Sequence, residues 1–344
     1  MDRKWRVGIL GLGHWYSAYN LARALPGHPR AELVAAWWHN RQQLDAFTST
    51  FAVRAHADYR ELLDRDDVDI VHLAAPVSEL HELTLAAAQA GKHIILGKPM
   101  AMTVEQADRM VEGVEAAGVC CVPFQAMTRL RVADLKARIA AGEIGDVAVL
   151  HQTCRWSIAE DWINSGRPGW FADPAHVPGG AFIDEGIYWL DAFRWLTGSE
   201  IVGADGRVAN LVHTDIAVED WGFATFTFAN GAVGTLEAAW TINAPRKSGP
   251  SPKQNAVVRL EIVGTRGEIV DQWFRSPGRA VLAAGANDWV FERQPEERFA
   301  PTSPLVLNHL IDCLEDRATP IATIRDARAS FVAAMQFYAA ARRP

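Results

Sequence analysis

The sequence predicts an α/β fold in which a doubly wound parallel sheet is followed by an α+β domain with an open, mostly antiparallel sheet. Three observations support this prediction. A strand, a glycine turn and a helix follow one another near the N-terminus, apolar strands alternate with helices over the first third, and strand pairs joined by turn residues dominate after residue 200. We expect residues 1–124 to form the first domain and residues 125–344 the second.

The N-terminal strand, residues 7–10, is followed directly by a glycine turn and by a helix over 16–25. In this order Gly11 permits the tight turn, and Gly13 lets the backbone approach a pyrophosphate at the helix N-terminus. The third glycine of such a dinucleotide-binding fingerprint would fall where the chain has Tyr16. An ordinary tight turn between a strand and a helix is therefore the alternative.

The other elements follow from hydrophobic periodicity and from turn residues. A capping box at Thr103 and Gln106 opens one helix, and Asn230-Gly231 marks a hairpin. We expect further strands at 32–37, 70–74, 93–96, 119–124, 147–156, 223–229, 232–240, 257–263 and 268–274. We expect further helices at 40–51, 78–90, 103–117, 133–141, 181–197, 305–315 and 325–341, and loops at 157–178 and 244–255, the second of them mobile.

Composition restricts the classes of function. The chain has 344 residues, of which 49% are hydrophobic and 22% charged, and its net charge of −7 argues against a nucleic-acid or anionic-membrane surface. No apolar run approaches the roughly 18–20 residues of a membrane span, and we expect no signal peptide. Cys120, Cys121, Cys154 and Cys313 lack the spacing of metal ligands, so we expect reduced thiols, no bound metal and a cytoplasmic protein.

A first motif, A-G-K-H-I-I-L-G-K-P at residues 90–99, contains a candidate catalytic lysine. Lys98 comes just past the carboxyl end of a predicted strand, where open α/β sheets bind ligands. Pro99 could hold a cis bond that fixes the direction of this lysine. The alternative is an exposed lysine in a turn.

A second motif, G-G-A-F-I-D-E-G-I-Y-W-L-D at residues 179–191, places polar groups at helical spacing. Asp184, Tyr188 and Asp191 share one face of the predicted helix, and Gly186 leaves room beside it for a ligand or a backbone. The alternative is the solvated stripe of an amphipathic helix.

Together, the glycine turn and the two motifs resemble the glucose–fructose oxidoreductase/inositol dehydrogenase (Gfo/Idh/MocA) family over essentially the whole chain. The resemblance implies a Rossmann domain that binds NAD or NADP, in an enzyme that oxidises a sugar or polyol hydroxyl or reduces the matching carbonyl. Lys98 matches the lysine of the family's E-K-P motif. Asp184 matches the aspartate of its D-x-G-x-H motif, and Tyr188 stands at the histidine position, where some members have tyrosine.

The chain departs from the family's pattern at several positions, which bear on the catalytic subclass rather than on the fold. Gly97 replaces the glutamate of E-K-P. Val77 and Leu80 replace the Asn and His of T-P-N-x-x-H, and Met127 stands where arginine is common.

Oxidation of a hydroxyl needs a proton acceptor within hydrogen-bond reach of it. The ordinary pKa of a tyrosine is about 10, and a neighbouring lysine ammonium lowers that pKa because it favours tyrosinate. We therefore expect Lys98 and Tyr188 to act as a coupled pair, with Asp184 orienting the substrate or the lysine.

The end of the second strand bears on the choice between NAD and NADP. The segment W-W-H-N-R, residues 37–41, has no carboxylate for a ribose 2′-hydroxyl. His39 and Arg41 suit a 2′-phosphate and Trp38 suits adenine, so we favour NADP over NAD; a merely solvated Arg41 is the alternative. The residues that we expect to contact the cofactor are Gly11, Gly13, His14, Trp15, Trp38, His39, Arg41, Ala75, Pro76, Lys98 and Gln125.

The loop over 156–170 mixes indole faces with polar groups, which suits a sugar or a cyclic polyol, although anchoring of the loop or a subunit contact would use the same residues. An open sheet needs a cover, so we expect a homodimer or homotetramer formed through the C-terminal sheet. Two other functions stay open: a redox-neutral sugar hydrolase or epimerase with a tightly bound dinucleotide, and a dinucleotide sensor without turnover. The residues that we expect to contact substrate are Lys98, Arg155, Trp156, Trp162, Trp170, Asp184 and Tyr188.

Overall fold

The computed structural model describes residues 4–157, 169–242, 256–273, 277–293 and 302–342. The chain divides into two compact units. The first unit comprises residues 1–127 and 299–328, and the second comprises residues 128–298 and 329–344. A segment late in the sequence therefore belongs to the first unit. The predicted mobile loop over 244–255 lies outside the described residues.

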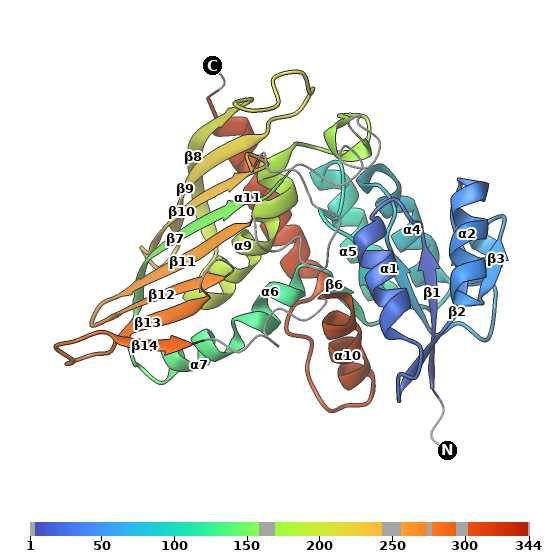
Figure 1. Ribbon diagram of the computed structural model, residues 1–344, viewed down its shortest axis with the longest axis horizontal. Coiled ribbons are helices and arrows are strands. Elements are labelled where there is room, and N and C mark those ends of the chain that lie inside the picture. The colour runs from blue at the N-terminus through green and yellow to red at the C-terminus, as the bar shows by residue number, and fades with distance from the viewer. Residues whose placement is uncertain (1–3, 158–168, 243–255, 274–276, 294–301, 343–344) are drawn as a thin grey trace. The chain divides into compact units, whose positions relative to one another are not determined.

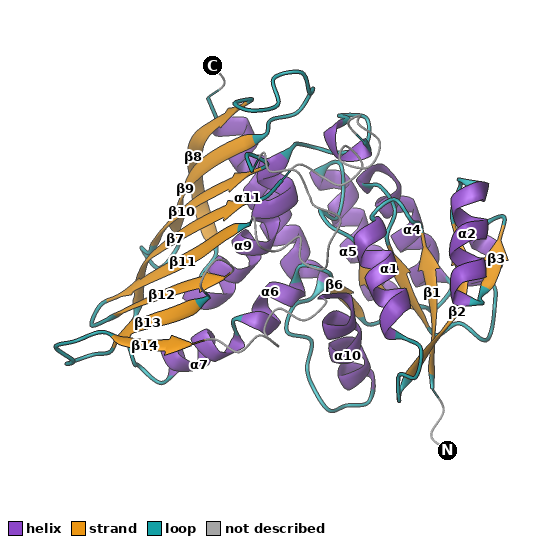
Figure 2. Cartoon of the chain, in the orientation of Figure 1, coloured by secondary structure: helices purple, strands orange, loops and turns teal. Residues whose placement is uncertain are grey.

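The first unit is built on a six-stranded parallel sheet with the order β3-β2-β1-β4-β5-β6 (Figures 1 and 2). This is the strand order of a doubly wound dinucleotide-binding sheet, which confirms the prediction from alternating strands and helices. Its strands are β1 (Trp5–Leu10), β2 (Ala31–Trp37), β3 (Arg54–His56), β4 (Ile70–Leu73), β5 (His93–Leu96) and β6 (Cys121–Pro123). Its helices are α1 (Trp15–Ala24), α2 (Arg41–Phe51), α3 (Tyr59–Leu63), α4 (Val77–Gln89), α5 (Val104–Ala117) and α10 (Thr302–Leu314).

Both residues of the capping box predicted for α5 cap the helix, although Gln106 binds the N–H of Met102 and not that of Thr103. The Thr103 hydroxyl accepts a hydrogen bond from the backbone N–H of Gln106 at 3.2 Å, and the Gln106 side chain accepts from the N–H of Met102 at 3.0 Å. The helix ends at Gly118, whose φ of 64° suits glycine. Strand β3 and helix α3 were not predicted, because elements of three and five residues are too short to show a hydrophobic period.

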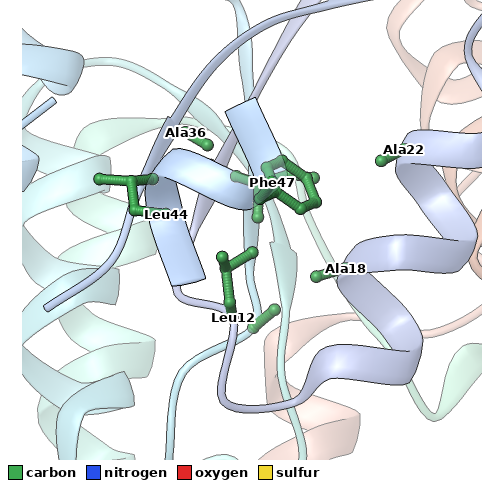
Figure 3. Close-up of a cluster of buried hydrophobic side chains, with 8 residues drawn as sticks. Leu12, Ala18, Ala22, Ala36, Leu44 and Phe47 are labelled. Atoms are coloured by element: carbon green, nitrogen blue, oxygen red, sulfur yellow. The ribbon is translucent and has the colours of Figure 1, made fainter. Parts of the chain in front are cut away.

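A buried cluster fixes the segment that follows β1 (Figure 3). Phe47 from α2 is fully buried and faces the small side chains of Ala18 and Ala22 on α1. Leu12, which lies between the two turn glycines, packs into the same cluster. Because protein cores are close-packed, these contacts hold the glycine turn in one place relative to both helices.

The second unit is built on an eight-stranded sheet with the order β14-β13-β12-β11-β7-β10-β9-β8, in which only β7 and β10 pair in parallel among the described strands (Figures 1 and 2). The mostly antiparallel second sheet is thereby confirmed. Its strands are β7 (Val147–Arg155), β8 (Ile201–Ala209), β9 (Trp221–Phe228), β10 (Val233–Ala239), β11 (Val257–Gly264), β12 (Glu268–Trp273), β13 (Gly278–Leu282) and β14 (Val290–Arg293). The helical segments that lie wholly or mostly in the second unit are α6 (Ala126–Arg131), α7 (Ala133–Ala140), η1 (Trp170–Ala172), α9 (Ala181–Thr197) and α11 (Ile324–Ala340).

Helix α9 covers one face of this sheet and contacts β7, β9 and β10. We call this face the inner face and the opposite one the outer face. A Cβ on Gly186 would lie 3.2 Å from Leu236 Cδ2 and 3.6 Å from Ala238 Cβ, so this glycine lets α9 lie close to β10. The predicted alternative of a solvated stripe is wrong, because Asp184, Tyr188 and Asp191 are all buried.

No helix in the described ranges is long and apolar enough to cross a membrane. Within the same ranges, no three His, Cys, Asp or Glu side chains are grouped as metal ligands would be.

Candidate active site

The glycine turn of the first unit lies directly against the end of β4. The N–H of Gly11 donates to the carbonyl of Trp37, and the N–H of His14 donates to the carbonyl of Ala74, both at 2.8 Å. Gly11 has a φ of 96°, and a Cβ on it would lie only 2.6 Å from the backbone nitrogen of Ala75. Only glycine satisfies both the backbone conformation and this close approach.

Gly13 completes the turn and brings four of the predicted cofactor contacts together. A Cβ on Gly13 would lie 2.9 Å from Pro76 Cδ and 3.1 Å from Trp38 Cη2. Four predicted cofactor contacts therefore lie together where β1, β2 and β4 end: Gly13, Trp38, Ala75 and Pro76. The bare backbone of the turn faces this edge, which is where open α/β sheets bind dinucleotides.

Polar contacts at the protein surface follow β2. His39 Nε2 lies 2.6 Å from Glu79 Oε2, and Arg41 Nε lies 2.9 Å from Asp45 Oδ1. Both side chains of the Arg41–Asp45 pair are more than half exposed. Exposed pairs of this kind contribute about 0–1 kcal/mol, so the Arg41 guanidinium can exchange its partner for another anion.

A buried cluster of two histidines and a serine supports the turn. Ser17 Oγ lies 2.7 Å from His14 Nδ1 and 3.0 Å from His72 Nε2, and it donates to the His14 carbonyl at 3.0 Å. A hydroxyl has one proton, so all three contacts are hydrogen bonds only if both imidazoles donate to Ser17. Burial lowers the pKa of His72 to about 4. Burial and then the charge of Lys98 lower the pKa of His14 well below its ordinary value, so both rings are neutral near pH 7.

This burial predicts a specific loss of stability in acid. Unfolding returns the pKa of His72 from about 4 to about 6.5, so the unfolded chain gains a proton that the folded chain lacks. The stabilisation from neutral His72 is complete above pH 6.5 and is lost as the pH falls toward 4, by about 3 kcal/mol. We expect the melting temperature to fall over this range, and to fall less steeply in His72→Gln. The exposed His151 supplies the control: His151→Gln should keep the native slope, and equal slopes in all three proteins would contradict the assignment.

Lys98 follows β5 at the same edge of the sheet. The Lys98–Pro99 peptide bond is cis, a conformation that the sequence left open, and Lys98 is only 2% exposed. An exposed turn lysine, the alternative considered from sequence, is therefore wrong. Its charge is the second cause, after burial, of the lowered pKa of His14 in the adjoining turn.

Gly97 and Leu80, two departures from the family pattern, are neighbours in the structure. A Cβ on Gly97 would lie 2.7 Å from the Leu73 carbonyl oxygen and 3.1 Å from Leu80 Cδ1. Leu80 is completely buried. A side chain at position 97 would overlap the Leu73 carbonyl first and would then press on Leu80, so the local backbone excludes a glutamate there. Both replacements are visible in the sequence, but the contact between positions 97 and 80 is visible only in the structure.

Two predicted cofactor residues carry buried polar atoms that suit a ligand. Among the described atoms, Trp15 Nε1 and Gln125 Nε2 are buried without a hydrogen-bond partner. Trp15 begins α1, next to the glycine turn, and Gln125 follows β6. Buried donors without partners are rare in native structures, and a bound dinucleotide offers them acceptors. These donors and the cradle formed by Gly11 and Gly13 fit such a cofactor.

In the second unit, α9 holds Asp184 and Tyr188 one helical turn apart. Asp184 Oδ2 accepts a hydrogen bond from Trp240 Nε1 at 3.2 Å, and Trp240 is 1% exposed. Trp156 donates through its Nε1 to Cys154 Sγ at 3.2 Å, on the inner face. Burial, with a smaller effect of Glu185, raises the pKa of Cys154, so this thiol stays protonated. The contact of Trp240 with Asp184 was not predicted, because Trp240 belongs to no local sequence motif.

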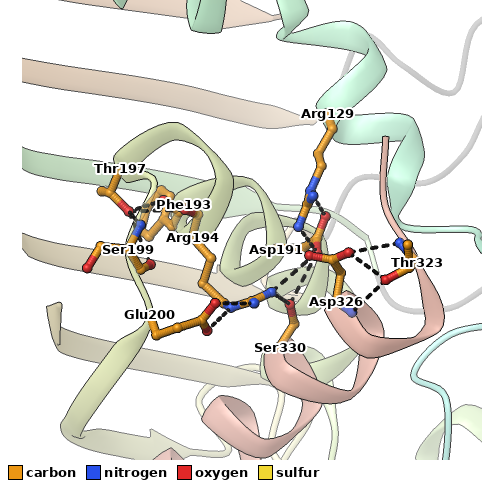
Figure 4. A network of polar contacts seen from close by, with 10 residues as sticks. All are labelled: Arg129, Asp191, Phe193, Arg194, Thr197, Ser199, Glu200, Thr323, Asp326 and Ser330. Carbon is orange, nitrogen blue, oxygen red and sulfur yellow. Dashed lines mark hydrogen bonds and ion pairs between the residues drawn. The ribbon is translucent and has the colours of Figure 1, made fainter. Parts of the chain in front are cut away.

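Asp191, the third polar residue of the predicted helix face, has a structural role (Figure 4). It is completely buried and forms a bidentate ion pair with Arg129, with oxygen–nitrogen distances of 2.7 and 2.8 Å. Ser330 Oγ donates to it at 3.3 Å, and Arg194 pairs with Glu200 beside it. A buried charge of this kind needs its partner, so Asp191 is committed to Arg129.

The remaining predicted substrate contacts do not all gather at Asp184. Arg155 forms a bidentate pair with Glu237, at 3.0 and 2.6 Å, on the outer face of the sheet. Successive residues of a strand face opposite sides of the sheet, so Cys154 lies on the inner face and Arg155 on the outer face. This alternation could be read from the sequence. Trp170 stacks on Phe171 with ring centroids 3.8 Å apart. Trp162 lies outside the described residues.

Comparisons with known proteins identify the family of both halves of the chain. Residues 5–124 match a model described as an oxidoreductase family with an NAD-binding Rossmann fold, and residues 132–270 match a GFO/IDH/MocA C-terminal domain. The chain is 29% identical to scyllo-inositol 2-dehydrogenase (NAD(+)) of Bacillus subtilis, over 95% of this chain and 91% of the relative. It is also 29% identical to levoglucosan dehydrogenase of Pseudarthrobacter phenanthrenivorans, over 78% and 74% of the two chains.

Among solved structures, aldose-aldose oxidoreductase of Caulobacter crescentus, complexed with glycerol, has the same fold, with a TM-score of 0.80. The two chains are 24% identical, and 99% of this chain and 98% of that chain are covered. Matches to both family models, in order along the chain, show that this chain belongs to the GFO/IDH/MocA family of oxidoreductases.

Proposed function

We propose that this chain is a dinucleotide-dependent dehydrogenase that transfers hydride between a nicotinamide and the CH–OH or C=O carbon of a sugar, a polyol or a related cyclic alcohol. The observation that carries the proposal is the bare glycine turn at the carboxyl edge of the parallel sheet, with buried Lys98 near it. Relatives named as dehydrogenases of scyllo-inositol and of levoglucosan support the substrate class.

The protein's own residues would take three roles. The nicotinamide, when bound, accepts or donates the hydride. We assign proton transfer at the reacting hydroxyl to Lys98 and Tyr188 as a pair, in line with the family motifs that they match. Asp184, held by the Trp240 indole, would orient the substrate. On the cofactor side, the backbone of Gly11 and Gly13 would hold the pyrophosphate.

The assay that tests the proposal is oxidation of a panel of sugars and polyols, including scyllo-inositol and levoglucosan, followed at 340 nm with NAD and with NADP. We expect net formation of reduced cofactor with at least one member of the panel. Substrate conversion with no net reduced cofactor would indicate a redox-neutral hydrolase or epimerase. Tight cofactor binding without conversion of any member would indicate a dinucleotide sensor. Either result would contradict the proposal.

For the cofactor, we propose that this chain prefers NADP to NAD. The segment after β2 offers no carboxylate to a ribose 2′-hydroxyl, and the exposed, weakly paired Arg41 is suited to a 2′-phosphate. We expect tighter binding of NADP by titration calorimetry, and we expect Arg41→Ala to narrow the difference to NAD by about tenfold, or about 1.4 kcal/mol. Asp45→Asn is the matched control, because it frees Arg41 and should preserve or widen the difference. Equal or reversed affinities in the native protein would contradict the preference.

We also propose that the chain forms a homodimer or homotetramer through the outer face of its second sheet. Phe223 and Val233 are 38% and 41% exposed on neighbouring strands of that sheet, and Phe223 lies parallel to Trp221. The two side chains lie at opposite ends of the β9–β10 pair, and a second copy covering this face would bury both of them. Sedimentation velocity should show a dimer or tetramer, and the Phe223→Glu variant should be a monomer. A monomeric native protein would contradict the proposed oligomer.

A further inference from the structure

Helix α9, which carries Asp184 and Tyr188, begins without a side-chain cap of its own. The residue before the helix is Gly180, which has no side chain to accept the first N–H groups. The N–H groups of the first helical turn have no carbonyl within the helix to bind, so each needs another partner. The first intrahelical bond runs from Asp184 N to the Gly180 carbonyl, at 3.1 Å.

All four N–H groups before that bond find partners in Glu219 and Tyr338. Glu219 is distant in sequence and precedes β9, and Tyr338 lies in the last turns of α11. The carboxylate of Glu219 accepts two of the four, its backbone carbonyl accepts a third, and the Tyr338 hydroxyl accepts the fourth. The bonds are Gly180 N to Glu219 Oε2 at 2.9 Å, Phe182 N to Glu219 Oε1 at 3.1 Å, Ala181 N to Glu219 O at 2.9 Å, and Ile183 N to Tyr338 Oη at 3.1 Å.

Glu219 and Tyr338 also bind each other. The Tyr338 hydroxyl donates to Glu219 Oε1 at 2.5 Å. Burial, together with the charge of Glu219, raises the pKa of Tyr338 well above 10, so the phenol keeps the proton that it donates. A carboxylate at the N-terminus of a helix is also favoured by the helix dipole. The pair thus forms one hydrogen-bonded unit with the start of α9.

The two glycines of the G-G-A-F motif are explained by this unit. A Cβ on Gly180 would overlap the Glu219 backbone carbonyl, and a Cβ on Gly179 would overlap the Tyr338 hydroxyl. The missing side chains let both partners approach the helix backbone.

The residue after Glu219 supports the side chain of Asp184 as well. The Asp220 carboxylate accepts the N–H groups of residues 211–213 at 2.6–2.8 Å, and its backbone carbonyl accepts the N–H of Trp240 at 2.7 Å. Trp240 in turn donates its indole N–H to Asp184. Residues 219 and 220 therefore connect to both the backbone and the side chain of the helix segment that carries Asp184.

We infer that Glu219 and Tyr338 are positioning residues of the active site: they cap α9 from outside and so fix the direction in which Asp184 and Tyr188 point. This inference rests on the proposed function, because it concerns the two residues to which catalysis is assigned. Neither Glu219 nor Tyr338 is itself assigned a contact with substrate.

The test uses Tyr338→Phe and Glu219→Gln in the full-length protein, compared with Tyr59→Phe. Tyr59 is a matched control because it also donates to a glutamate, Glu82, at 2.5 Å, but it lies in the first unit. We expect faster amide hydrogen exchange in the segment 180–190 of both α9 variants. We also expect kcat to fall by about 10- to 100-fold, since a displacement of about 1 Å at a reacting group can cost about 100-fold. The Kd for the cofactor should stay within about twofold.

A deuterated substrate separates positioning from general destabilisation. In a folded but misaligned site the chemical step limits turnover more, so the primary isotope effect on kcat should rise in both α9 variants and stay native in Tyr59→Phe. Faster exchange with native kcat and a native isotope effect would overturn the positioning role, and native exchange in both variants would overturn the cap. A native protein without turnover on any substrate would instead overturn the proposed function, and the exchange data would still decide whether the pair caps the helix.

Discussion

Lys98→Met and Tyr188→Phe should each lower kcat by about 100- to 10,000-fold, the range that proton-transfer catalysis typically supplies. If the two side chains act as one unit, removing either removes most of what both provide, so the double variant should be little slower than either single one. The affinity for cofactor should change much less than kcat. Steady-state kinetics on the best substrate of the panel, with cofactor Kd from calorimetry, measures both quantities.

Lys92→Met is the matched control for this pair. Lys92 is also largely buried, and its ammonium donates to the Arg65 carbonyl at 2.7 Å, but it precedes β5 whereas Lys98 follows it. The control should therefore keep native turnover. Nearly full turnover in Tyr188→Phe would show that the pair is not the proton acceptor, and Asp184 would become the first candidate.

Tyr188→His should keep measurable activity with a pH optimum moved downward, because imidazole has a lower pKa than phenol.

Gly13→Val should weaken cofactor binding by at least about 100-fold, which is at least about 2.7 kcal/mol. A Cβ at this position already lies within 3.1 Å of Pro76 and Trp38, and a β-branched side chain would crowd the edge to which we assign the pyrophosphate. Calorimetry measures the affinity, and circular dichroism shows whether the variant is folded.

Two further variants distinguish a clash with the bound cofactor from a general effect of a larger side chain. Gly13→Ala adds a single methyl group and should give an intermediate loss if the phosphates lie against the turn. Gly203→Val is the matched control, because a Cβ there meets no atom closer than 3.7 Å and the residue lies in β8 of the second unit. Native affinity in folded Gly13→Val would mean that the phosphates bind elsewhere.

The parts of the fold that could be predicted from sequence are those with local causes. The glycine turn, the Thr103 capping box and the Asn230-Gly231 hairpin each depend on residues within one element or its immediate neighbours. The short elements β3 and α3 could not be predicted, because they are too short to show a hydrophobic periodicity. Strands β8, β13 and β14 were also missed; β8 is interrupted by Gly203 and Gly206 and resembles a loop.

The candidate site was predicted less completely, because its supports lie far apart in the chain. Trp240 reaches Asp184 across 56 residues, and Tyr338 reaches Ile183 across 155. No motif connects such positions, and only the tertiary fold brings them together. Arg155 is different, since the alternation of β7 places it out of phase with buried Cys154 and could have assigned it to the outer face.

The central claim is that hydride passes from a substrate carbon to a dinucleotide that then leaves the protein. The most direct measurement uses the sugar or polyol oxidised fastest in the panel, deuterated at its ring carbons, together with NADP or NAD and the native protein. Mass spectrometry of the released cofactor should show one deuterium per reduced nicotinamide, in equal amount to the oxidised substrate. Converted substrate with no deuterium in any released cofactor would contradict the claim.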